Sequence, residues 1–400
     1  MLRSGTEDCC MKYAYLALSL IVCAALNAQE DPDLAYNCRT KMRAKERGDG
    51  FHPGADSLAA TTQPTYNAPG SVKLSNDWAG FATVSYLYWF AGQEGMDLAT
   101  TSLFVEGGGV VVPPESGSET IFQNSNYTSG FKLGAGFHLN QYDHWVFRAD
   151  YTWIREHATL SQQAPTTAPS SSGLSLITDD VLYFTSWFFQ NSAAGQPLAA
   201  EEVSTSWHMN LDFIDGVASR AYYQGKSLVV TPFGGLRAAL IRQNLRISAN
   251  SVLNVVPPTQ PVISHNKSNS WGIGPHGGVG AHWLVGSGVR LQGNVQASLL
   301  FTQYTSVVHT EDAITLAYPV TFSFQNYNCL RPMAEMDLGL GWLYYFSDGL
   351  ALDLSATYDF NYLWGQNMMR TLNDLNNIGV NSASNNLYLH GLTISAALEF

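Results

Sequence analysis

The sequence predicts an all-β fold: an antiparallel transmembrane β-barrel of about ten strands, with twelve strands as the alternative. Its 400 residues are 46% hydrophobic but only 13% charged, whereas soluble domains carry about 25% charged residues. Apart from an N-terminal leader, no stretch approaches the roughly 18 consecutive apolar residues of a membrane-spanning helix. Apolar and polar residues instead alternate over segments of about ten residues. On composition alone, a secreted soluble β-sandwich is the competing fold.

The N-terminus predicts an exported protein. Residues 1–28 are expected to be a signal peptide, with Lys12 as its positive charge and Ala28 at the cleavage site. Acidic residues precede Met11, which is unusual for the start of a signal peptide. Translation is therefore expected to begin at Met11.

The mature chain is expected to contain two parts. Residues 29–76 are predicted to be a periplasmic N-terminal segment, partly disordered, and residues 77–400 the barrel. Five basic residues lie between positions 39 and 47. They fit a solvated linker, or contact with an acidic envelope polymer or an anionic headgroup. The formal net charge of −12 argues against a nucleic-acid partner.

Ten segments carry the alternation that predicts strands. In chain order they are 77–90, 131–139, 145–154, 207–213, 228–247, 271–285, 289–302, 333–346, 350–364 and 387–400. The first is partly apolar on both faces. The second and third flank the turn "NQYDH" and each places five apolar residues on one face. The fourth and fifth flank the longer connection "GVASRAYYQGKS".

The clearest alternation lies in segment 289–302. Its odd positions run from Val289 to Phe301 and are apolar or glycine, whereas its even positions from Arg290 to Ser298 are all polar. Five polar residues on one face are hard to reconcile with a strand that is buried on both faces. A tight turn at 286–288 joins it to segment 271–285.

The last three segments complete the predicted barrel. Segments 333–346 and 350–364 flank a tight turn at 347–349, and aromatic residues gather at the ends of their apolar rows. Such aromatic girdles mark the two membrane interfaces. Segment 387–400 ends on Phe400 and is expected to close the barrel, which removes the exposed strand edge.

The connections alternate between short turns and long loops. The long loops are 91–128, 155–202, 248–270, 303–331 and 365–386, and "TSLFVEGGGVVV" and "DDVLYFTSWFF" within them fit strands or short helices. In outer-membrane barrels the short turns are periplasmic and the long loops extracellular. An even number of strands then places both termini in the periplasm.

Polar residues on the face opposite the apolar rows are predicted to line the lumen. They are Lys132, Arg148, Asp150, His208, Asp212, Arg237, Arg290, Gln292, Asn294, Glu335, Asp337, Asp353 and Asp359. Their charges fit either a salt-bridge network that fills a narrow barrel or a constriction that selects solutes. Ten strands favour the first interpretation slightly, because small barrels are filled by side chains.

Several blocks resemble a known family. They are "FKLGAGFHLNQYDHWVFRADYTWI", "WHMNLDFIDG", "VVTPFGGLRAALIRQNLRIS", "WGIGPHGGVGAHWLV" and "RPMAEMDLGLGWLYYFSDGLALDLSATYDFNYLWGQNMM". In this order they resemble the Legionella-type major outer membrane protein family, which is grouped with chlamydial major-outer-membrane-like proteins, over about residues 78–400. The resemblance implies an abundant, pore-forming barrel in the outer membrane of a Gram-negative bacterium. It also implies that Phe400 belongs to a C-terminal signal read by the barrel-assembly machinery.

Other motifs carry weaker signals. "GIGPHG" matches the dinucleotide pattern GxGxxG, but strand-like alternation continues through it and no helix is expected after it. Pro275 within it predicts a bulge or weak pairing. The histidines show no closely spaced ligand pair, so neither a metal nor another cofactor is expected.

The two cysteines of the mature chain are expected to lie on opposite sides of the membrane. Cys38 falls in the periplasmic segment and Cys329 near an outer loop, so no bridge between them is predicted. The resemblance implies the alternative of intermolecular disulfides. A crosslinked or homo-oligomeric assembly is one expectation from it.

The sequence therefore predicts an outer-membrane pore for passive diffusion of small hydrophilic solutes, embedded in outer-membrane lipid, with a structural role in the envelope. The alternative is a closed barrel that acts as an adhesin or surface scaffold through its long loops. An outer-membrane hydrolase is disfavoured, and no catalytic residue is assigned. His157 beside Glu156 is the candidate pair for such chemistry, and a solvated loop pair explains it better.

Overall fold

The computed structural model describes residues 78–104, 118–139, 144–164, 180–185, 187–189, 199–224, 227–252, 261–312, 320–346, 350–377 and 385–400. The expected signal peptide, the segment 29–76 with its basic residues and Cys38 lie outside this part of the chain. Within it, no helix is long and apolar enough to cross a membrane.

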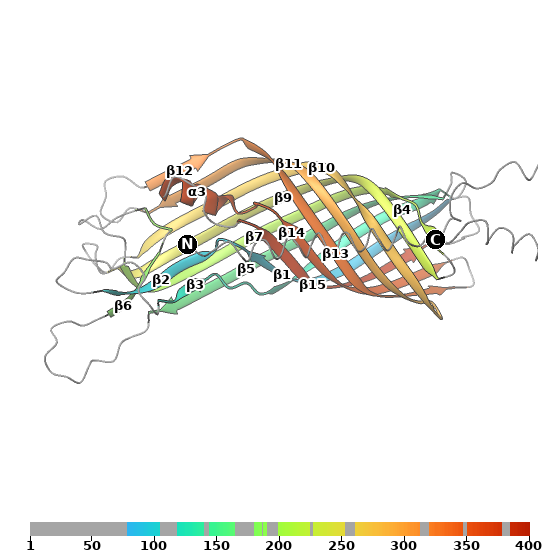
Figure 1. Cartoon of the computed structure of the whole chain (residues 1–400), viewed down its shortest axis with the longest axis horizontal. Helices are drawn as coiled ribbons and strands as arrows, with labels where there is room; N and C mark the ends of the chain where they lie inside the picture. The colour runs from blue at the N-terminus through green and yellow to red at the C-terminus, as the bar shows by residue number, and fades with distance from the viewer. Residues whose placement is uncertain are drawn as a thin grey trace, which may run out of the picture. The chain divides into compact units, whose positions relative to one another are not determined.

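Ten long antiparallel strands form a closed barrel (Figure 1). They are β1 (Trp78–Gln93), β4 (Tyr127–Leu139), β5 (Trp145–Gln163), β7 (Ala199–Ser219), β9 (Leu228–Val252), β10 (Val262–Gly286), β11 (Val289–Glu311), β13 (Tyr327–Tyr345), β14 (Ala351–Leu363) and β15 (Leu387–Glu399). Each pairs with the next in this order, and β15 pairs with β1. The predicted ten-stranded barrel is confirmed.

The first and last strands close the barrel. Their register runs from Phe81 opposite Glu399 to Gln93 opposite Leu387. Beyond it, Gly80 and Phe400 exchange two backbone hydrogen bonds of 2.8 and 2.9 Å. Each of the ten barrel strands thus has a partner on both sides, as a bilayer requires because lipid cannot satisfy backbone polar groups.

The two ends of the barrel differ. At one end, which we call the short-turn end, β10 and β11 are joined at Gly286–Gly288, where Ser287 and Gly288 have φ of 53° and 80°. At the other, the long-loop end, additional elements lie between barrel strands (Figure 1). These are β2 (Asp97–Phe104), β3 (Thr120–Phe122), β6 (Asp180–Phe184), β12 (Val320–Phe324) and α3 (Met368–Asn377). A three-residue strand, β8 (Tyr222–Gln224), pairs with the start of β9.

The strands at the long-loop end run further than predicted. β9 and β10 have 25 residues each, and β5 and β7 extend into the expected loop 155–202. A membrane crossing needs only about 9–11 residues. These strands therefore continue beyond the bilayer as a projecting wall.

The outward face of each long strand changes character along its length. On β9 the outward side chains are apolar from Leu228 to Leu240 and then become Arg242, Asn244 and Arg246. The same change falls between Trp153 and Arg155 on β5, between Ile214 and Asp212 on β7, and between Trp271 and Asn269 on β10. We call the apolar zone on the short-turn side of this change the apolar belt. Its side chains are strongly exposed, with Leu338 at 69% and Leu236 at 58%, as expected where lipid covers them.

Candidate functional site in the barrel lumen

A polar cavity of about 380 Å³ lies inside the barrel, lined by residues of all ten strands. We call it the chamber. It lies within the belt-level part of the barrel, where inward side chains are polar because outward ones meet lipid. Its charged residues are six carboxylates and four cations: Asp150, Asp215, Glu335, Asp337, Asp353, Asp359, Lys132, Arg148, Arg237 and Arg290.

Arg237 on β9 lies at the centre of the largest ion-pair network. Its guanidinium donates to both carboxylate oxygens of Asp215 at 2.6 and 2.8 Å and also contacts Glu335. The guanidinium stacks over Phe213 at 4.9 Å from the ring centroid. Arg237 is only 3% exposed, so burial of its charge requires both carboxylates.

Two further arginines in the chamber are paired. Arg290 donates to both oxygens of Asp353 at 2.7 Å, and its Nε donates to Gln292 at 3.1 Å. Arg148 donates to Asp150 at 2.8 Å. The three arginines thus use most of the carboxylates around them, which is the pattern of a braced lumen.

Two carboxylates have no arginine partner. Asp337 accepts from the Asn294 amide at 2.8 and 3.0 Å, and Asp359 accepts from Thr357 at 2.9 Å and from Thr393. They stand directly opposite each other on β13 and β14. Within the described residues, Lys132 has no carboxylate within 4.0 Å. The chamber is therefore net acidic, by the two carboxylates that exceed its four cations.

The structure places eleven of the thirteen predicted lumen residues around the chamber. The two others, His208 and Asp212, face outward, so their assignment to the lumen is wrong. The prediction put apolar Trp207, Met209 and Leu211 toward lipid. This part of β7 lies beyond the apolar belt, where the outward face meets water and the inward face packs against a core.

The sequence prediction missed several chamber residues. Asp215 on β7 is the main one, because it replaces Asp212 as the partner of a lumen arginine. Continuing the strand past Phe213 with odd positions inward would have found it. His276 and Thr393 also line the chamber.

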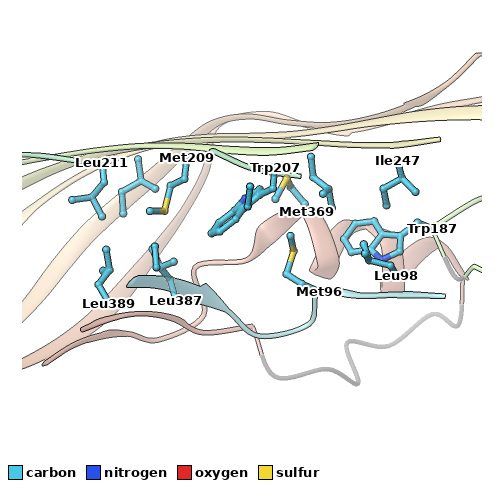
Figure 2. Packing of buried hydrophobic residues seen from close by; sticks show 14 of the residues in the cluster. Met96, Leu98, Trp187, Trp207, Met209, Leu211, Ile247, Met369, Leu387 and Leu389 are labelled. Atoms are coloured by element: carbon cyan, nitrogen blue, oxygen red, sulfur yellow. The ribbon is translucent and has the colours of Figure 1, made fainter. Parts of the chain in front are cut away.

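An apolar cluster fills the lumen on the long-loop side of the chamber, and we call it the apolar plug. Figure 2 shows side chains of β7 and β9 pointing toward those of β15 and β2 across the lumen, with Met369 and Trp187 between them. Its core members are Met96, Leu98, Trp187, Trp207, Met209, Leu211, Ile247, Met369, Leu387 and Leu389. Each is at most 3% exposed.

Helix α3 contributes to the apolar plug from a long loop. Asn367 caps its N-terminus, since its Oδ1 accepts from the Arg370 backbone N–H at 3.1 Å. Arg370 then pairs with Asp97 at 3.0 Å and Asp374 at 2.8 Å, and its guanidinium lies 5.5 Å from the Trp187 ring centroid. The helix is thus held against the inner wall by both polar and apolar contacts.

The other candidate sites do not assemble in the described residues. His157 and Glu156 point to opposite sides of β5, and His157 stacks outside the barrel on His208 at 4.0 Å between ring centroids. "GIGPHG" lies within the continuous strand β10. Pairing of β10 with β11 is interrupted at Gly274 and Pro275, but the register is the same on both sides, so the proline weakens pairing without a bulge. No group of three His, Cys, Asp or Glu among the described residues could hold a metal.

Cys329 is a free thiol on the inward face of β13. It packs against a small cluster that includes Tyr304, Val307 and Met368. A crosslink to another chain through Cys329 would require this packing to open.

Comparison with known proteins supplies a family. The family described as Legionella pneumophila major outer membrane protein precursor matches residues 73–400. No curated protein matches the sequence significantly. Among solved structures, the outer membrane protease OmpT from Escherichia coli is similar over 83% of this chain and 99% of its own, at 10% identity and a TM-score of 0.36. A FadL homologue from Pseudomonas aeruginosa is similar over 81% of this chain and 90% of its own, at 8% identity and a TM-score of 0.22.

Proposed function

The chain belongs to the Legionella major outer membrane protein family and is a Gram-negative outer-membrane barrel, and from this premise we propose that it is a gated pore for passive diffusion of small hydrophilic solutes. The observation that carries the proposal is the chamber. A barrel that only anchors loops needs no polar cavity of about 380 Å³, large enough for many water molecules, at membrane level. Charged side chains around such a cavity are the usual means by which pores select solutes.

The apolar plug supports the gated form of this proposal. Polar solutes that cross the chamber would next meet Trp207, Met209 and Leu211, whose one strong hydrogen-bonding group is the indole N–H of Trp207. Hydrophobic constrictions close pores by excluding water. Opening would require α3 and its neighbours to move away from the wall, since α3 belongs to a loop and not to the barrel.

A closed structural barrel is the second candidate, and the same plug is the observation in its favour. Buried side chains from opposite walls point toward one another in it and belong to one apolar cluster (Figure 2). Such a barrel would serve the envelope mechanically and present its long loops at the surface. Much of those loops lies outside the described residues.

Single-channel conductance in planar bilayers tests the pore. We expect rare, small openings for the refolded chain and a several-fold larger conductance for the variant Trp207→Ala/Met209→Ala, which removes plug side chains that are fully buried. The matched control is Phe301→Ala/Leu338→Ala, which truncates lipid-facing side chains and should leave conductance unchanged.

Chamber variants provide the second arm of the experiment. Neutralising Asp353 or Arg290 should alter conductance or ion preference, because these two side chains form an ion pair that lines the chamber. If the plug variant folds into a heat-modifiable barrel yet stays silent, the pore is wrong and the structural barrel is favoured.

A further inference from the structure

The outward-facing cations are confined to one side of the barrel. Within the described part of the chain, every lysine and arginine that points away from the barrel lies on β5, β7, β9 or β10, which are consecutive in the wall. With three neighbouring histidines they form a group that we call the basic patch: Arg155, His157, His208, Arg242, Arg246, His265 and Lys267.

Strand register brings these side chains together. Lys267 on β10 stands opposite Asn244 on β9, so it is the diagonal neighbour of both Arg242 and Arg246. Diagonal neighbours on a sheet lie about 7–8 Å apart, within reach of long side chains. On the other side of β9, His208 also stands opposite Asn244. A single anionic group placed over Asn244 could therefore contact several cations.

Most of the charge in the basic patch is uncompensated. Asp212 neutralises Arg155 through contacts of 2.9 and 3.0 Å, and Asp312 lies 3.6 Å from His265. In contrast, Arg242, Arg246 and Lys267 have no carboxylate within 4.0 Å among the residues described. Three unpaired cations on adjacent strands create a local positive field on a chain whose net charge is −12.

The position of the basic patch relative to lipid identifies its ligand. The patch begins one step past the apolar belt, directly beyond Trp153, Leu240 and Trp271. It lies on the long-loop side, which faces the exterior in outer-membrane barrels. Elsewhere around the barrel this level carries aromatic rings instead, such as Tyr88, which stacks on Tyr127 at 5.2 Å. Because the basic patch places cations at headgroup level on one side of the barrel, it would attract anionic lipid headgroups there.

We propose that the basic patch binds the phosphate groups of a phosphorylated lipid in the outer leaflet. Arg242 and Arg246 can each donate two parallel hydrogen bonds to a phosphate, and Lys267 adds a point charge between them. The lipid's acyl chains would lie along the apolar belt below. The site is on the outer surface, so the inference does not depend on whether the lumen conducts.

Binding of purified diphosphoryl lipid A to the refolded full chain in neutral detergent tests the proposal. We expect saturable binding that weakens at least tenfold in Arg242→Gln/Arg246→Gln/Lys267→Gln. The matched control Asn210→Gln/Asn269→Gln changes two outward amides at the same level and should bind as the native chain does. Equal binding by the charge-neutralised and native chains would overturn the proposal.

Further arms distinguish the source of the phosphate and guard against misfolding. Dephosphorylated lipid A should bind at least tenfold more weakly, and inorganic phosphate at millimolar concentration should displace little of the lipid. Full displacement by inorganic phosphate would assign the patch to the free anion and overturn the lipid assignment. If the triple variant does not fold, salt replaces it: binding to the native chain that is unchanged between low and high salt would contradict a site made of exposed cations.

Discussion

Arg237 shows how a single residue can hold the lumen together. Its guanidinium is buried between Asp215 and Glu335, and removing it would leave two carboxylates close together with little access to water. Loss of one partner from a buried ion pair costs about 3–5 kcal/mol, because the remaining charge is uncompensated. Arg237 therefore matters for stability mainly because its loss would leave the charges of Asp215 and Glu335 uncompensated. The attraction between Arg237 and these carboxylates contributes less.

Arg237→Ala is expected to lower the free energy of unfolding by about 3–5 kcal/mol. The measurement is urea-dependent folding into lipid vesicles, followed by tryptophan fluorescence. Arg155→Ala is the control, since its ion pair with Asp212 lies on the outward face of the barrel, with the two side chains 31% and 20% exposed, and is expected to contribute about 1 kcal/mol or less. Equal losses in the two variants would show that burial does not distinguish these pairs.

At the scale of single elements, β9 combines two kinds of strand. Near the short-turn end it is apolar outside and polar inside, and beyond Leu240 it is polar outside and apolar inside. Lipid faces the first part and water the second, so the hydrophobic effect reverses the pattern without any break in the strand. The outward face becomes polar in the same way on β5, β7 and β10, and these strands build a wall that projects beyond the bilayer. On β10 the inward side chains of this part are polar too: Ser264, Asn266, Ser268 and Ser270.

Arginine substitutions on the outward face of β9 test this boundary. Leu236→Arg, within the apolar belt, is expected to cost about 2–4 kcal/mol of folding free energy, because it places a cation in the hydrocarbon layer. Asn244→Arg, on the same face beyond the belt, is expected to change it by less than about 1 kcal/mol. Both changes in folding free energy are measured by the same urea-dependent folding into lipid vesicles. Similar costs at the two positions would place the bilayer boundary elsewhere.

The strands that lie within the bilayer were predicted more accurately from the sequence than the parts of strands that lie beyond it. Strands β11, β13 and β14 cross the belt with strict alternation, and their inward residues and their boundaries at the short-turn end were predictable. At the long-loop end β11 continues to Glu311 and β13 begins at Tyr327, both beyond the predicted limits. The parity of β7 at 207–213 was predicted wrongly, because a rule that puts apolar residues outward holds only within the bilayer. On β7 the outward residues near this boundary, Asp212, Ile214 and Gly216, include no aromatic ring to mark the membrane interface. The boundary there follows from the lengths and pairings of neighbouring strands.

The elements between the barrel strands at the long-loop end were the least predictable. β2 and β6 pair with each other and β6 pairs with β7, so their form depends on partners far away in the sequence. The short amphipathic helix α3 is stable only because Met369 and its neighbours pack into the lumen. Local propensity left "TSLFVEGGGVVV" and "DDVLYFTSWFF", which include parts of β2 and β6, open between strand and helix, and it placed the residues of α3 in a loop.

At the scale of the whole molecule, the barrel joins two environments along one axis. The belt-level half holds a polar chamber inside a lipid-facing wall, and the projecting half holds an apolar plug inside a water-facing wall. Transport through the proposed pore would therefore be controlled by two separable features. The apolar plug would determine whether the pore is open, and the charges of the chamber would determine its ion selectivity.

The chamber's charge predicts that preference. Asp337 and Asp359 face each other on neighbouring strands without an arginine partner, and they account for the excess of carboxylates over cations. If the lumen conducts, this excess should favour cations, because a narrow, low-dielectric passage focuses the field of its wall charges. The reversal potential in a salt gradient measures the preference. Asp337→Asn/Asp359→Asn should move the reversal potential toward zero, whereas Asp353→Asn alone, which frees the guanidinium of Arg290, should move it toward anion preference. A cation preference that survives the double substitution would place the selecting charges outside the chamber.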